Sequence, residues 1–143
     1  MTPLAKTILQ EHEGKRLMPY VDTEGKATIG WGRNLTDVGI SYDEALYLFN
    51  NDVVRAENEC YTHFSWFYAL DEVRREVITM LCFNLGINGL LGFKLMLKAI
   101  EAHDWSQAAW ELSNSQWKTQ VGKERHDCLT SALQFGEWNK VIV

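Results

Sequence analysis

Two carboxyl groups and a hydroxyl group lie close together near the start of this sequence. Glu13, Asp22 and Thr28 follow the spacing Glu-x8-Asp-x5-Thr, and Ile29-Gly30-Trp31-Gly32 comes directly afterwards. A carboxylic acid can protonate a leaving group, while a carboxylate and a hydroxyl can position a water molecule. An inverting glycosidase uses a pair of carboxyl groups in this way. The spacing therefore predicts that this segment hydrolyses glycosidic bonds.

The acid of this set, Glu13, is expected at the end of a short helix. Thr2-Pro3 is typical of a helix start, with Thr as the N-cap and Pro in the first helical position. Gly14 is typical of the residue that ends a helix. Glu13 would then lie in the last turn, where the negative end of the helix dipole disfavours a carboxylate. That environment suits a general acid.

The other two members of the set are expected on a hairpin. Residues 20–22 and 27–29 are predicted to form two short strands on either side of the turn sequence Thr23-Glu24-Gly25-Lys26. Asp22 and Thr28 would flank this turn and face back toward the helix end. The short loop after the hairpin, residues 34–39, leads to the next helix.

The remaining sequence is predicted to be helical. Ser41-x-x-Glu44 is a capping box that opens a helix reaching about Cys60, and a helix of that length spans ~28 Å. Further helices are expected from Asp71 to a stop at Gly86, over 93–102, from Asp104, and over about 123–135. The fold class is therefore predicted to be α+β, and mostly α.

Composition and charge exclude several classes of function. The chain has 143 residues, sufficient for one domain, and a net charge of −5. The acidic excess lies in residues 41–80, and no basic face indicates a nucleic-acid partner. Three cysteines without a C-x-x-C pair and four scattered histidines predict free thiols and no metal site or cofactor.

Targeting signals are not recognised in the sequence. The N-terminus has no basic region followed by an apolar region, and no segment approaches the ~20 apolar residues of a membrane span. We therefore expect no membrane insertion, and synthesis in the cytoplasm.

The chain resembles the bacteriophage lysozymes of the T-even type, which are endolysins of glycoside hydrolase family 24. The Glu-x8-Asp-x5-Thr spacing with the following Ile-Gly-x-Gly matches the first segment of that family. Three further matches follow in the family's order, which extends the resemblance over nearly the whole chain. They are residues 46–53, residues 73–86 with Gly92-Phe93, and residues 105–120 with Arg125.

The resemblance implies a lysozyme-like fold of two lobes within one domain, residues 1–143. The small N-terminal lobe, about 1–40, would hold the first helix and the hairpin, and a connecting helix would run over about 41–60. The helical C-terminal lobe would cover about 61–143. The loop at 34–41 is shorter than in larger family members, and the pI of about 5.3 differs from the basic character of many of them.

The resemblance also implies a reaction and a set of site residues. Glu13 would be the general acid, while Asp22 and Thr28 would hold the hydrolytic water. The substrate would be bacterial peptidoglycan, cut at the β-1,4 bond between N-acetylmuramic acid and N-acetylglucosamine. Substrate-binding roles would fall to residues of the C-terminal lobe: Phe83, Gln120 and Arg125.

The resemblance places this activity in the lysis of a host cell. The enzyme would be a monomer that waits in the host cytoplasm and reaches the periplasm and cell wall after a separate holin-type protein opens the membrane.

The same residues leave other functions open. A lytic transglycosylase could use Glu13 alone, although Asp22 and Thr28 then have less to do. A chitinase-like amino-sugar hydrolase is another enzymatic alternative. A catalytically inactive wall-binding domain of a phage structure is a non-enzymatic alternative, and the intact set of three residues counts against it.

Overall fold

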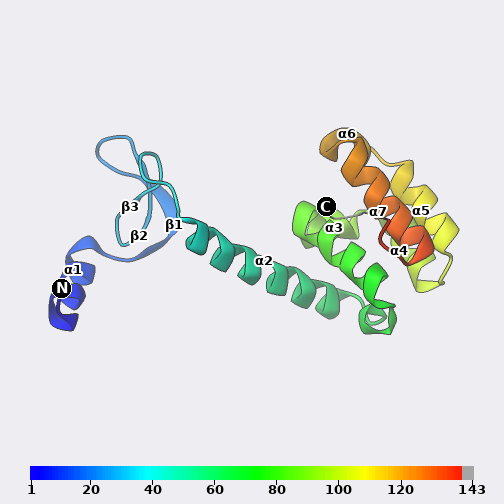
Figure 1. Ribbon diagram of the computed structural model, residues 1–143, viewed down its shortest axis with the longest axis horizontal. Coiled ribbons are helices and arrows are strands. Elements are labelled where there is room, and N and C mark those ends of the chain that lie inside the picture. The colour runs from blue at the N-terminus through cyan, green and yellow to red at the C-terminus, as the bar shows by residue number, and fades with distance from the viewer. Residues whose placement is uncertain (140–143) are drawn as a thin grey trace. The chain divides into compact units, whose positions relative to one another are not determined.

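The computed structural model describes residues 1–139, and the chain divides into two compact units (Figure 1). The first unit ends at Leu48 and the second begins at Phe49, so the division falls within helix α2. The first unit holds α1 (Pro3–Glu13), β1 (Arg16–Val21), β2 (Ala27–Gly30), β3 (Arg33–Asn34) and the start of α2 (Tyr42–His63). The second holds the rest of α2, the 3-10 helix η1 (Phe67–Ala69), α3 (Glu72–Leu91), α4 (Lys94–Glu101), α5 (Trp105–Ser113), α6 (Trp117–Val121) and α7 (Lys123–Phe135).

Helix α1 begins and ends as the sequence predicts. The side chain of Thr2 accepts a hydrogen bond from the backbone N–H of Ala5 at 3.2 Å, and Pro3 occupies the first turn. Gly14 ends the helix with φ of +71°, and its N–H donates to the carbonyl of Gln10. Glu13 is therefore the last residue of α1, as expected.

The three strands form one antiparallel sheet in the order β1-β2-β3. Tyr20 pairs with Thr28 across β1 and β2, and an irregularity interrupts this pairing between Arg16 and Tyr20. Thr28 also pairs with Asn34 of β3. The predicted hairpin is confirmed. Strand β3 was not predicted, and its second residue, Asn34, was expected in the loop over 34–39.

Helix α2 opens with the predicted capping box. Ser41 Oγ accepts from the N–H of Glu44 at 3.2 Å, and Glu44 Oε1 accepts from the N–H of Ser41 at 3.0 Å. Arg33 Nη1 lies 2.8 Å from Glu44 Oε2 and also donates to the carbonyl of Gly39. Arg33 thus ties β3 to the start of α2. These contacts hold the pKa of Glu44 at about 2, chiefly through the hydrogen bond from Arg33 and then that from the Ser41 N–H.

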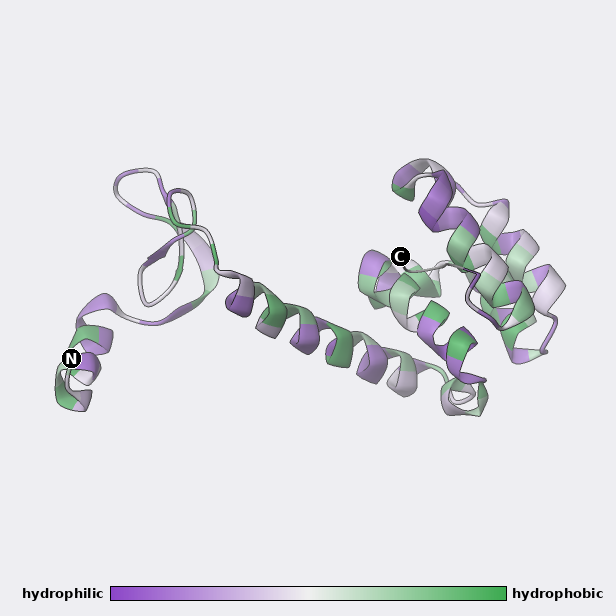
Figure 2. Ribbon diagram, in the orientation of Figure 1, coloured by the Kyte–Doolittle hydropathy of each residue, from purple (hydrophilic) through white to green (hydrophobic). Residues whose placement is uncertain are grey.

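Helix α2 is 22 residues long and continues three residues beyond Cys60, the expected end. Figure 2 shows hydrophilic and hydrophobic residues alternating around it. Its buried residues, Ala56 and Cys60, lie in its second half and belong to the core of the second unit.

The core of the second unit is formed mainly by α3, α5 and α7 with α4 and α6. Helix α5 contributes Ala108, Ala109 and Leu112, and the buried residues of α3 are Val77, Ile78, Thr79, Leu81, Cys82 and Leu90. Trp117 is 1% exposed, and its indole N–H donates to Asn84 Oδ1 at 3.0 Å. The largest fully buried side chains are Trp117, Phe67, Ile78, Leu81, Leu90, Met96, Ile100, Leu112, Leu129, Leu133, Val77 and Cys60.

Arg74 joins three helices of this unit. Its Nε donates to the carbonyl of Leu133 at 2.7 Å and its Nη2 to that of Gln134 at 2.6 Å, at the end of α7. The guanidinium also lies over the ring of Trp105 on α5, 4.1 Å from its centroid. Arg74 therefore satisfies two of the carbonyl groups that a helix end leaves without partners.

Two features of the second unit refine the helix boundaries. Gly86 leaves the helical conformation, with φ of +71° and ψ of 163°, so α3 breaks where the sequence predicts its end and then resumes to Leu91. The short helix α6 was not predicted. Helix α5 begins as expected, because the side chain of Asp104 accepts a hydrogen bond from the N–H of Gln107. Helix α7 ends as expected, at Gly136, which has a left-handed conformation.

All three cysteines are free thiols, as predicted. Cys60 and Cys82 are buried, and burial raises the pKa of each thiol. Over residues 1–139, no single helix has the length and apolar character to cross a membrane, although α3 and α4 meet those criteria as a pair bent by 105°.

The contact between Arg33 and Glu44 predicts a pH-dependent stability. Because its pKa in the folded state, about 2, lies below the ordinary value of 4.5, Glu44 stabilises the fold fully above pH 4.5. That stabilisation is lost as the pH falls through about 2. The melting temperature of Glu44→Gln should therefore lie below that of the wild type at pH 7, and the gap should close toward pH 2.

The control is Glu11→Gln, which removes one carboxylate from the exposed surface of α1. Thermal unfolding of the three proteins between pH 7 and pH 2 makes the comparison. A gap for Glu44→Gln that stays constant over this range would show that the ion pair does not stabilise the start of α2.

Candidate active site

The turn between β1 and β2 is built around the carboxylate of Asp22. Its Oδ1 accepts hydrogen bonds from the N–H of Glu24 at 2.9 Å and of Lys26 at 2.8 Å. The backbone of Asp22 adds two bonds, donating to the carbonyl of Lys26 at 2.9 Å and accepting from the N–H of Gly25 at 3.1 Å. Asp side chains favour such turns because they can bond to the backbone that follows them.

These bonds fix the orientation of the Asp22 side chain. Oδ1 is occupied by two backbone donors, while Oδ2 accepts no hydrogen bond from any residue in the range 1–139. The side chain is half-buried. Asp22 therefore presents one oxygen that is available to a water molecule or a substrate.

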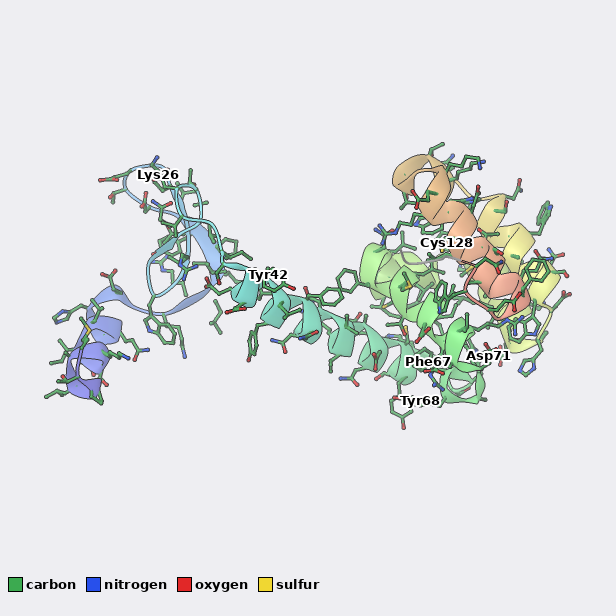
Figure 3. The ribbon with its side chains drawn as sticks, viewed as in Figure 1. Lys26, Tyr42, Phe67, Tyr68, Asp71 and Cys128 are labelled. Atoms are coloured by element: carbon green, nitrogen blue, oxygen red, sulfur yellow. The ribbon has the colours of Figure 1, made fainter. Side chains whose placement is uncertain are left out.

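Thr28 is the buried member of the set. It is 3% exposed, and its Oγ1 donates to the carbonyl of Lys26 at 3.0 Å. Because a hydroxyl has one donor and two acceptor positions, the lone pairs of Oγ1 can still accept a hydrogen bond. Asp22 and Thr28 are thus both hydrogen-bonded to the backbone of Lys26, the residue labelled in Figure 3.

Glu13 is carried by a different element of the same unit. It is exposed at the end of α1, and its carboxyl group lies close to Gly32, the residue before β3. In the described part of the chain, no hydrogen bond or ion pair joins Glu13 to Asp22 or Thr28. A general acid and a water-holding pair act on opposite sides of a sugar bond in an inverting enzyme, so direct contact between them is not required.

The predicted substrate-binding residues belong to the second unit. Phe83 and Arg125 line one cavity of about 630 Å³, whereas Gln120 is exposed on α6 and does not line it. The ring of Phe83 packs against that of Phe49, with centroids 5.9 Å apart. Phe67 and Tyr68, labelled in Figure 3, are further aromatic residues of the wall. The second unit therefore has a cavity lined by aromatic side chains, and Arg125 is the cationic residue of its lining that was predicted to bind substrate.

Two features of the site were not predicted from the sequence. The first is the link between Asp22 and Thr28, because both side chains bond to the backbone of Lys26 and the residue type at position 26 does not indicate such bonds. The approach of Gly32 to Glu13 brings together residues 19 positions apart in the sequence, and the Gly-x-Gly pattern alone does not indicate it. Across residues 1–139, no group of three or more His, Cys, Asp or Glu side chains is arranged to hold a metal ion.

The chain is similar to known proteins over most of its length. A family model described as phage lysozyme matches residues 10–140. Two proteins of Dictyostelium discoideum, "Probable T4-type lysozyme 1" and "Probable T4-type lysozyme 2", are 30% and 33% identical to the chain, over alignments of 168 and 165 residues. The first alignment covers 97% of this chain and 98% of that protein, and the second covers 95% and 96%. The pre-baseplate central spike protein Gp5 of Enterobacteria phage T4 is 28% identical over 158 residues, which cover 90% of this chain and 27% of Gp5.

Proposed function

Because the chain belongs to the phage lysozyme family, we propose that it cuts the β-1,4 bond between N-acetylmuramic acid and N-acetylglucosamine. At the level of the family, the protein is a glycoside hydrolase of the lysozyme type, and its substrate is peptidoglycan. The observation that carries the finer proposal is the hydrogen-bonded arrangement of Asp22, Lys26 and Thr28 in the same unit as Glu13.

Glu13 is the proposed general acid. Cleavage of a glycosidic bond leaves an alkoxide on the departing sugar unless a proton reaches the bridging oxygen as the bond breaks. The side chain of Glu13 is exposed at the end of α1, so a bound glycan can reach it. Glu13 would therefore give its proton to the leaving oxygen.

Asp22 and Thr28 would together hold the attacking water. The Thr28 hydroxyl proton is committed to the Lys26 carbonyl, so Oγ1 can meet a water only as an acceptor. Asp22 Oδ2 is likewise an acceptor. A water that donates one proton to each of them turns its lone pair toward the anomeric carbon. As the bond forms, one of these protons passes to Asp22, which acts as the general base.

The glycan would also contact the second unit, and the reaction would serve the lysis of a host cell. The proposed glycan contacts of the second unit are Phe83, Gln120 and Arg125. The aromatic side chains around Phe83 support this proposal, because their apolar faces can pack against a sugar ring. The family description, phage lysozyme, supports a role in host lysis. In that role a monomer would stay in the host cytoplasm until a holin-type protein released it to the cell wall.

The first test of this proposal is Glu13→Gln. The change removes the transferable proton and keeps the size of the side chain, so clearing of a peptidoglycan suspension should fall by about 10²–10⁴-fold. Glu11→Gln on the same helix is the matched control and should clear at the wild-type rate. Equal melting temperatures would confirm that both variants are folded.

Two outcomes would contradict the proposal. If Glu13→Gln kept more than about a tenth of the wild-type rate, general acid catalysis by Glu13 would be excluded. If the wild type released sugars from insoluble chitin faster than it cleared peptidoglycan in the parallel assay, the enzyme would be a chitinase-like hydrolase.

The second test separates the hydroxyl of Thr28 from its packing. Thr28→Val keeps the shape of the side chain and removes the acceptor for the water, so turnover should fall by about 10–100-fold. Thr28→Ser keeps the hydroxyl and loses only a methyl group, and it should retain most of the activity. If valine and serine at this position gave similar rates, Thr28 would have a packing role alone.

A further inference from the structure

Gly32 lies where the backbone comes closest to the carboxyl group of Glu13. A Cβ atom placed on Gly32 with ideal geometry would lie 2.9 Å from Glu13 Oε2 and 3.5 Å from its carboxyl carbon. Cβ atoms do not approach oxygen atoms that closely, so any side chain at this position must displace the carboxyl group. The φ angle of Gly32, +79°, is a second reason why glycine is favoured here.

We propose that Gly32 is a positioning residue for Glu13. Its missing side chain leaves the space in which the Glu13 carboxyl group lies against the backbone that leads from β2 to β3. This inference rests on the proposed role of Glu13 as the general acid. It adds a residue that acts through Glu13, by setting where the carboxyl group of the proposed acid is held.

The consequence of filling this space should fall on activity rather than on folding. The atom that a new Cβ would meet is the far end of a flexible, exposed side chain. That end can rotate away at little cost, and the fold is then retained. The acid, however, leaves the position from which it protonates the leaving oxygen, and misplacement of a reacting group by about 1 Å can cost 10²-fold in rate.

Gly30 provides a matched control two residues away. Its φ angle, +70°, also lies in the left-handed region, where an alanine is strained as it is at Gly32. Unlike Gly32, Gly30 has no atom within 4 Å of the place its Cβ would occupy. Gly30→Ala and Gly32→Ala therefore share the backbone penalty and differ in contact with Glu13.

The experiment combines a spectroscopic signal with an activity. Protein labelled with ¹³C at the glutamate carboxyl carbon gives a signal for Glu13, which is assigned by its loss in Glu13→Gln. Chemical shifts at a fixed pH and peptidoglycan clearing rates are then measured for the wild type, Gly30→Ala and Gly32→Ala. We expect Gly32→Ala to move the Glu13 signal and to clear roughly 100-fold more slowly than Gly30→Ala, with similar melting temperatures for the two variants.

The results separate this inference from the proposed function. A Glu13 signal that does not move in Gly32→Ala overturns the inference, as does a clearing rate equal to that of Gly30→Ala. If Glu13→Gln itself clears peptidoglycan at the wild-type rate, the proposed role of the acid fails, while the carboxyl signal still reports whether Gly32 controls the position of Glu13.

Discussion

The backbone of Lys26 is the constraint on which the rest of the proposed site depends. Its N–H donates to Asp22 Oδ1, and its carbonyl accepts from both the Asp22 N–H and the Thr28 hydroxyl. The carboxylate and the hydroxyl are therefore fixed relative to each other by bonds that use no side-chain atom of Lys26. Because all of these bonds lie within residues 22–28, the geometry of the pair is set locally in the first unit. The same bonds leave Asp22 Oδ2 and a lone pair of Thr28 Oγ1 as acceptors for the water that the proposed chemistry requires.

Glu13 is held by a different kind of constraint. It ends α1, where Gly14 takes a left-handed φ, and its carboxyl group fits beside a second glycine, Gly32. The acid thus depends on a helix end and on an absent side chain, whereas Asp22 depends on donors that bind it directly. This difference suits the two roles proposed for them, because the water must be held in one place while a general acid must gain and lose a proton in each turnover.

The parts of the structure that were predictable from sequence are those determined by neighbouring residues. Thr2, Asp71 and Asp104 cap helices through bonds to residues three positions away, so their residue types alone indicate the helix starts. The set of Glu13, Asp22 and Thr28 was found by its spacing, and the turn beside it by Asp22 and Gly25. Strand β3 was missed because two residues carry no periodic pattern and are held by pairing with β2. Helix α6 has five residues and no side-chain cap, and the burial of Trp117 against other helices favours it. The contact of Gly32 with Glu13 also depends on residues distant in sequence.

The stereochemistry of the first-formed product tests the central claim, that Asp22 and Thr28 direct a water molecule to the sugar, most directly. Attack by a water on the face opposite to the leaving group inverts the anomeric carbon, so a β-linked glycan should give the α-anomer of N-acetylmuramic acid at the new reducing end. NMR spectra recorded within the first moments of digestion, before mutarotation, distinguish the anomers. A β-anomer would mean that a protein group attacks the sugar first, and a 1,6-anhydro end would mean that no water is used. Either result would contradict the account.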